Sequence, residues 1–106
     1  MRIRLARQVY SDLAGAMDYY LQESGGQIAT EFYSEFKRCL PHIAAFPHSY
    51  PVVRQNVRRI NFRRFPYHIL FEIVEESYVK VLVVKHDRRD PDFGLDGTLA
   101  DLNESK

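Results

Sequence analysis

The chain has 106 residues, the size of a single domain. Hydrophobic residues make up 45% and charged residues 27% of the sequence, which is typical of a folded globular domain and excludes a disordered chain. The longest apolar runs are far shorter than the ~20 residues that span a bilayer, and the first residues form no signal-peptide core. Cys39 is the one cysteine, so an internal disulfide framework is excluded. These features predict a cytoplasmic protein that does not bind a membrane.

Charge is unevenly distributed along the chain. The formal net charge is +1, but residues 1–89 carry 14 Lys and Arg against 9 Asp and Glu, whereas residues 90–106 carry 1 against 5. A basic cluster of this kind suits a polyanion or an acidic protein partner. It is also consistent with a solvated strand edge, where positive charge discourages edge-to-edge aggregation. The basic residues in question are Arg54, Arg58, Arg59, Arg63 and Arg64, followed by Lys85, Arg88 and Arg89.

The first half of the chain predicts a short strand and then a helical hairpin. Residues 2–5 alternate charged and apolar side chains, which favours a strand. Apolar residues then recur at the three-and-four spacing of a helix face over 9–21 and again over 28–43. Gly25-Gly26 is expected to end the first helix, because glycine adopts the left-handed conformation at low steric cost. Pro41 is expected to kink or restart the second helix.

The second half predicts a loop and then antiparallel strands. Segment 46–51 is expected to be a loop, because its prolines disfavour helix in the residues before them. Aromatic and β-branched residues at period two predict strands over 57–62, 65–74 and 78–86. The short connection 75–77 makes the last two strands a hairpin. The order β-α-α-β-β-β predicts a two-layer α+β domain in which the helical hairpin packs on a small antiparallel sheet.

Within the strand 65–74, the alternation predicts one face toward the core. Tyr67, Ile69 and Phe71 share that face, while His68 and Glu72 point away from it. The single domain is expected to extend over residues 1–93. The acidic tail 94–106 has little apolar content and is expected to be irregular and mobile.

The common signatures of catalysis and metal binding are absent from the sequence. There is no glycine-rich phosphate loop, and a lone cysteine cannot complete a zinc site. We therefore expect no cofactor and no metal. Cys39 lies on the apolar stripe of the second predicted helix, so it is expected to be a core residue rather than a nucleophile.

The end of the last predicted strand combines an imidazole with guanidinium groups. His86 is followed closely by Arg88 and Arg89. An imidazole with a near-neutral pKa could act as an acid or base at a phosphate, and arginines could stabilise the charge that develops there. The alternative is that these arginines pair with Asp87 or Asp90 and only anchor the tail.

Two segments together resemble the ParE branch of the RelE/ParE toxin superfamily. The first is residues 59–73, RINFRRFPYHILFEI, where an arginine precedes a Phe-Pro-Tyr element that opens a strand. The second is residues 81–91, VLVVKHDRRDP, an apolar strand that ends in His-x-x-Arg-x-Pro. The resemblance covers roughly residues 1–93 and implies two helices packed on a small antiparallel sheet, which is the fold that the periodicity predicts.

The resemblance also implies a function, the toxin of a type II toxin–antitoxin system. ParE-branch toxins poison DNA gyrase, whereas RelE-branch toxins cut mRNA in the ribosomal A site. Because the sequence shows no compelling acid–base constellation, the leading expectation is a ParE-like gyrase inhibitor that stabilises a plasmid or chromosome. Its expected partner is a cognate acidic antitoxin, which neutralises it in a hetero-oligomer. The alternatives are a ribosome-dependent mRNA endoribonuclease and a degenerate, non-toxic homologue that binds an antitoxin.

Several residues match positions of the family motif. Arg59 and Arg89 match its recurrent arginines, and His86 matches its histidine at the end of the last strand. These three would be catalytic only in an endoribonuclease. Tyr67 matches the aromatic residue of the Phe-Pro-Tyr element and is expected to pack in the core. The residues expected to bind the target or a polyanion are Arg58, Arg59, Arg63, Arg64, Lys85, Arg88 and Arg89.

Overall fold

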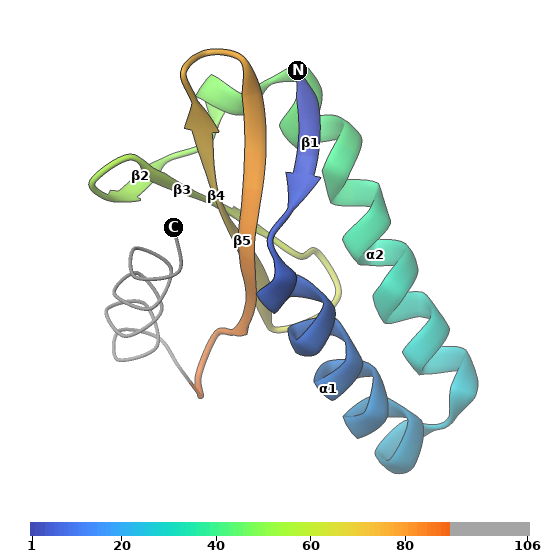
Figure 1. The fold of residues 1–106 in the computed structure, drawn as a ribbon. Helices are drawn as coiled ribbons and strands as arrows, with labels where there is room; N and C mark the ends of the chain where they lie inside the picture. Colours follow the sequence, from blue (N-terminus) through green and yellow to red (C-terminus); the bar gives the residue numbers. More distant parts are fainter. Residues whose placement is uncertain (90–106) are drawn as a thin grey trace.

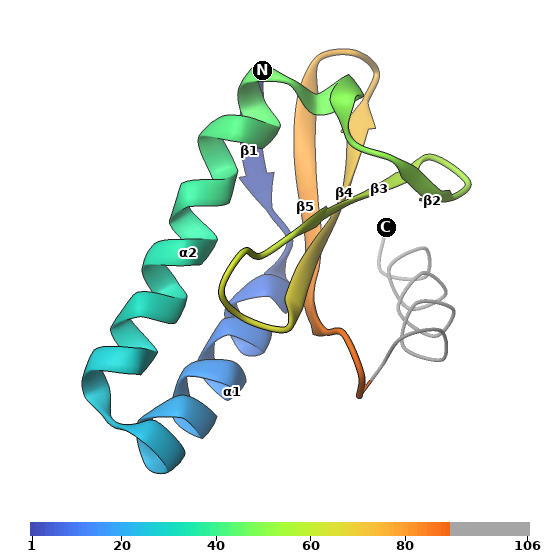
Figure 2. The ribbon, with the colours of Figure 1, turned by 180° about the vertical axis from the view of Figure 1, so that it is seen from behind.

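The computed structural model describes residues 1–89, which form two helices and a five-stranded sheet. The helices lie side by side on one face of the sheet, so the predicted two-layer α+β architecture is confirmed (Figure 1, Figure 2). The expected tail 94–106 lies outside the described residues. The elements in chain order are β1 (Arg2–Leu5), α1 (Arg7–Ser24), α2 (Gly26–Ala45), the 3₁₀ turn η1 (Pro47–Ser49), β2 (Val52–Arg54), β3 (Val57–Asn61), β4 (Tyr67–Val74) and β5 (Tyr78–His86).

The sheet has the strand order β1-β5-β4-β3-β2. Strands β3, β4 and β5 pair with one another in antiparallel orientation, as predicted. Strand β2 is antiparallel to β3, and β1 lies parallel to β5. A parallel pair requires a long crossover connection, and the helices with the strands after them provide it. Strand β2 was not predicted. It is only three residues long and all three are exposed, so it carries no alternation that sequence reading could detect.

The helical hairpin forms as predicted. Gly25 is the one residue between α1 and α2, and its φ of 97° is a backbone conformation that L side chains rarely adopt. Pro41 does not restart α2, which runs without interruption to Ala45. Pro41 and Lys37 are both exposed, so water can reach the Lys37 carbonyl that the proline leaves without its helical donor.

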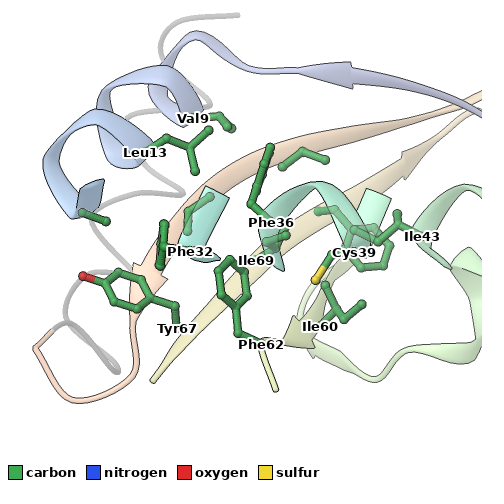
Figure 3. Packing of buried hydrophobic residues seen from close by; sticks show 14 of the residues in the cluster. Val9, Leu13, Phe32, Phe36, Cys39, Ile43, Ile60, Phe62, Tyr67 and Ile69 are labelled. Carbon is green, nitrogen blue, oxygen red and sulfur yellow. The ribbon is translucent and has the colours of Figure 1, made fainter. Parts of the chain in front are cut away.

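The main hydrophobic core lies between the helices and the sheet. Figure 3 shows Phe32 and Phe36 of α2 beside Ile69 of β4, with Cys39 and Ile43 of α2 further along the same core. The predicted alternation in β4 is confirmed, because Tyr67, Ile69 and Phe71 all belong to this core. The other buried members are Val9, Leu13, Ala16, Cys39, Ile60, Phe62, Val79, Val81 and Val84.

A smaller apolar cluster lies on the sheet face away from the helices. It consists of Val57, Leu70, Leu82 and Val83. The pairing of β4 with β5 shifts register between Leu70 and Phe71, so Leu82 is an extra residue in β5. The adjacent residues Leu82 and Val83 therefore both belong to this second cluster. The sheet thus has buried apolar residues on each face.

Candidate functional site

The sheet separates Arg59 from His86. Side chains of directly paired residues on neighbouring strands lie on the same face of a sheet. Arg59 pairs with Leu70, which belongs to the cluster away from the helices. His86 pairs with Tyr67, which belongs to the main core on the helix side. The two residues that the family motif singles out therefore lie on opposite faces.

Arg89 lies on the helix side of the sheet together with His86. Its Nη2 donates a hydrogen bond to the Tyr67 hydroxyl oxygen at 3.1 Å. Its guanidinium carbon also lies 5.2 Å from the centre of the Tyr19 ring, within the range of a cation–π interaction. The two tyrosines hold the arginine in place while its side chain remains exposed.

An open pocket of about 330 Å³ lies between α1 and β5, and His86 and Arg89 both line it. Helix α1 contributes Ser11, Gly15 and Tyr19, which were not among the predicted site residues. They are spaced four residues apart and so share one helix face. This spacing, centred on a glycine, is the signal by which sequence reading could have found them.

Asp12 fixes the position of α1 against β5. Strand β1 ends at Leu5, and the Ala6 N–H then donates to the Val81 carbonyl at 2.8 Å. Further along β5, the Val84 N–H donates to Asp12 Oδ2 at 2.9 Å. Beyond the end of β1, the Asp12 carboxylate thus accepts the hydrogen bond that a carbonyl of a paired strand would otherwise accept. The bond satisfies the buried N–H of Val84 and holds α1 against β5, where the two elements form the walls of the pocket.

The imidazole of His86 has a structural task. Its Nδ1 accepts hydrogen bonds from the main-chain N–H groups of Arg88 at 3.0 Å and Arg89 at 3.2 Å. The neutral ring must therefore carry its proton on Nε2. Taking a proton at Nδ1 would break both of these bonds. The geometry thus gives His86 the role of fixing the turn that presents Arg89.

Asp87 is bonded to the face of the sheet away from the helices. Its Oδ1 accepts a hydrogen bond from His68 Nδ1 at 2.7 Å and a longer one from Arg59 Nη2 at 3.4 Å. The expected alternative pairing of Asp87 with the neighbouring arginines does not form, because Asp87 contacts His68 and Arg59, whereas Arg89 contacts Tyr67 and Tyr19. Asp90, the other proposed partner, lies outside the described residues.

The family model for the ParE toxin of the type II toxin–antitoxin system parDE matches residues 3–91. The chain belongs to this family. It is therefore a ParE toxin, and the ParDE system to which such toxins belong implies an antitoxin partner.

A solved structure shares the fold of this ParE toxin. A chain from the structure described as the chromosomal ParDE TA system from P. aeruginosa superposes with a TM-score of 0.72 at 18% sequence identity. The match covers 81% of this chain and 95% of that chain. At this identity the match shows a common fold. No curated protein matches the sequence significantly.

Two of the other cations of this ParE toxin are bound within the fold. Arg58 Nη1 donates to the main-chain carbonyls of His48 at 3.2 Å and Tyr50 at 2.7 Å. Arg64 Nη2 forms an ion pair with Glu31 Oε1 of α2 at 2.6 Å. Both arginines anchor loops to the body of the domain.

The remaining cations are Lys85, Arg63 and Arg88. Lys85 is the register partner of His68, which points away from the helices, and it also contributes to the lining of the pocket beside α1. Arg63 lies in the connection between β3 and β4, and Arg88 lies in the turn after β5, each exposed. Of the seven residues expected to bind a polyanion, Lys85 and Arg89 thus line the pocket beside α1, and Arg59 and Arg63 line a different pocket.

Burial keeps the side chains of Tyr67 and Cys39 in their neutral forms. Burial raises the pKa of Tyr67, although the charge of Arg89 and the hydrogen bond from it oppose the effect. The phenol therefore stays protonated at neutral pH. Burial also raises the pKa of the Cys39 thiol to about 11, so this residue is an inert core thiol, as the sequence predicts.

Two further findings concern residues 1–89 as a whole. No group of three His, Cys, Asp or Glu side chains in this part of the chain is placed to hold a metal ion. Neither described helix combines the length and apolar character needed to span a bilayer.

Proposed function

We propose that this ParE toxin acts by binding DNA gyrase and blocking its cycle rather than by cutting RNA. The observation that carries the proposal is the separation of Arg59 from His86 and Arg89 by the sheet. Cleavage of a phosphodiester requires an acid, a base and charge-stabilising groups within hydrogen-bonding reach of one phosphate. The three catalytic candidates of this chain cannot converge on such a point without rearrangement.

Arg89 is the best-placed residue for contact with the target. Its guanidinium is exposed, yet Tyr67 and Tyr19 orient it. An arginine that is already ordered loses less conformational entropy on binding than a free one, and arginines of this kind commonly dominate binding energy. The open pocket beside it provides a place for a complementary group of the partner.

The proposal includes neutralisation by the antitoxin. We expect a small acidic protein, partly disordered when alone, that folds as a helix or an added strand on the toxin. The antitoxin would suppress toxicity by covering Arg59 and Arg89. Because gyrase acts on the chromosome, the site of action would be the cytoplasm.

The test is a supercoiling assay with purified toxin, gyrase, relaxed plasmid and ATP. The expected result is loss of supercoiling or a trapped cleavage complex, reversed by the protein encoded in the neighbouring reading frame. Full supercoiling together with cleavage of ribosome-bound mRNA would overturn the proposal in favour of an endoribonuclease. Full supercoiling without cleavage and without growth arrest would indicate a non-toxic antitoxin-binding homologue.

A further inference from the structure

A second group of cations lies between α2 and β3, apart from the pocket that Arg89 lines. An open pocket of about 300 Å³ is lined there by Arg38 and His42 of α2, by Arg59 and Asn61 of β3, and by Arg63. No residue of this pocket also lines the one beside α1. Among the described residues, no carboxylate lines it.

The buried carboxylate of Glu35 organises one side of this pocket. Arg38 donates from Nε at 2.9 Å and from Nη2 at 2.5 Å to Glu35 Oε2. The main-chain N–H groups of Arg63 and Arg64 also stabilise the charged form of Glu35. Glu35 is 7% exposed and lies behind the pocket rather than in its lining. It therefore fixes Arg38 and the β3–β4 connection relative to each other.

The other two guanidinium groups add charge that the fold does not fully neutralise. Arg59 Nε donates to Asn61 Oδ1 at 2.7 Å, and its Nη2 shares Asp87 Oδ1 with His68. Within residues 1–89, the Arg63 side chain makes no hydrogen bond or ion pair, and it is exposed. Three arginines thus line the pocket, while the carboxylates of Glu35 and Asp87, which are outside its lining, offset part of their charge.

The edge of β3 also supplies a main-chain donor, the N–H of Asn61, to this pocket. The Arg59 N–H bonds to the Pro51 carbonyl at 3.1 Å, whereas the Phe62 N–H bonds to Tyr67 of β4 at 2.9 Å. Successive residues of a strand direct their N–H groups to alternate sides. The Asn61 N–H therefore points to the outer edge, where β2 no longer pairs with β3.

We infer that this pocket binds a phosphate group. Planar guanidinium donors match the oxygens of a phosphate, and Arg38 and Arg59 are fixed in advance by their partners. Such preorganisation reduces the entropic cost of binding. The phosphate could belong to a free ion or nucleotide, or to the backbone of a nucleic acid. The inference does not depend on the proposed action on gyrase.

The test is an NMR titration of the full ¹⁵N-labelled chain at constant ionic strength with chloride as the background anion. Inorganic phosphate, a short single-stranded oligodeoxynucleotide and sodium glutamate are the three probes. We expect saturable shifts of the Arg38, His42, Asn61 and Arg63 amides with phosphate. Tighter binding of the oligonucleotide than of phosphate identifies a nucleic acid as the source, and the reverse identifies a free phosphate.

Arg63→Ala and Arg64→Ala form a matched pair. Each removes one exposed arginine from the same connection, but the Arg64 side chain pairs with Glu31 outside the pocket. We expect Arg63→Ala to weaken phosphate binding at least fivefold and Arg64→Ala to change it less than twofold, with both spectra still those of the folded chain. Equal effects of the two variants, binding of glutamate as tight as that of phosphate, or shifts that do not saturate would each overturn the inference.

Discussion

His68 Nδ1 lies 2.7 Å from Oδ1 of Asp87, a bond that ties β4 to the turn after β5. Because a carboxylate can only accept, Nδ1 must carry the proton. His68 is 3% exposed, whereas the Asp87 side chain is 35% exposed. The bond therefore joins a buried imidazole to a carboxylate at the boundary with solvent, and Arg59 shares that carboxylate.

We expect the free energy of unfolding to fall as the solution becomes acidic. Burial lowers the pKa of His68, and the charges of Arg59 and Lys85 act in the same direction, while Asp87 opposes them. The unfolded chain then binds this proton more readily than the folded chain. Stability is fully present above the unfolded histidine pKa of ~6.5 and is lost as pH falls through the lower pKa of the folded state.

Urea unfolding at a series of pH values measures this effect. His68→Gln should flatten the dependence below about pH 6.5. The control is His42→Gln in phosphate-free buffer, which changes an exposed histidine and should leave the dependence unchanged. If the free energy of unfolding of His68→Gln depends on pH as steeply as that of the parent chain, another group is responsible and the account of His68 is wrong.

The Glu35–Arg38 pair makes a second stability prediction. Glu35→Gln should lower the free energy of unfolding by about 2 kcal/mol, because a neutral amide replaces the carboxylate that pairs with a partly buried guanidinium and its NH2 group cannot accept from the surrounding donors. Burial alone raises the pKa of Glu35, but the hydrogen bond and charge of Arg38 outweigh it, so the pKa is lowered overall. The stabilisation is thus present above about pH 4.5 and is lost as pH falls through the depressed folded value.

Glu31→Gln is the matched control for Glu35→Gln. Glu31 also pairs with an arginine, Arg64, but that pair is far more exposed. Loss of the Glu31–Arg64 pair should therefore lower the free energy of unfolding by less than about 0.5 kcal/mol. Chemical unfolding at neutral pH compares the two variants, and equal losses would show that burial does not distinguish the pairs.

Comparison of Arg89→Ala with Arg88→Ala tests whether the oriented arginine, rather than its exposed neighbour, contacts the target. Arg89 is held by Tyr67 and Tyr19, whereas Arg88 is exposed beside it. If Arg89 contacts the target, its removal should weaken gyrase inhibition by about tenfold, which corresponds to ~1.4 kcal/mol of binding energy. Arg88→Ala should change inhibition less than twofold. Dose–response curves in the supercoiling assay compare them, and indistinguishable curves would exclude Arg89 as the contact.

The turn between β4 and β5 contains two strained residues. Glu75 and Glu76 have φ values of 53° and 52°, in the left-handed region that favours glycine. Glu75→Gly should raise the free energy of unfolding by about 0.5 kcal/mol, since relief of strain exceeds the added entropy of the unfolded chain. Glu76 is unsuitable for this test because it pairs with His48. Glu75→Ala keeps a Cβ and should not raise the free energy of unfolding. If Glu75→Gly lowers the free energy of unfolding, the backbone at Glu75 is not strained.

The sequence was most informative where a pattern is long and local. The helices of 18 and 20 residues and the alternation in β4 each repeat over several turns or pairs, so their faces could be predicted. The three exposed residues of β2 contain no such repeat. The parallel pairing of β1 depends on a strand more than 70 residues later, and no local pattern encodes it.

The candidate site could be predicted in its residue types but not in its geometry. Arg59 and His86 match one family motif, yet the register of β3 with β4 places them on opposite faces. That register depends on the connection between the strands, which periodicity does not specify. His68 was correctly predicted to point away from the core, but its burial depends on distant Asp87 and Arg59.

The most direct test of binding to gyrase, as opposed to RNA cleavage, is the order in which cellular processes stop. Expression of the toxin without its antitoxin in a bacterium, followed by pulses of labelled thymidine and labelled methionine, measures replication and translation in parallel. The account predicts that thymidine incorporation stops first while methionine incorporation continues, and that Arg89→Ala delays the arrest. Translation that stops first, with mRNA cleaved on ribosomes, would contradict it.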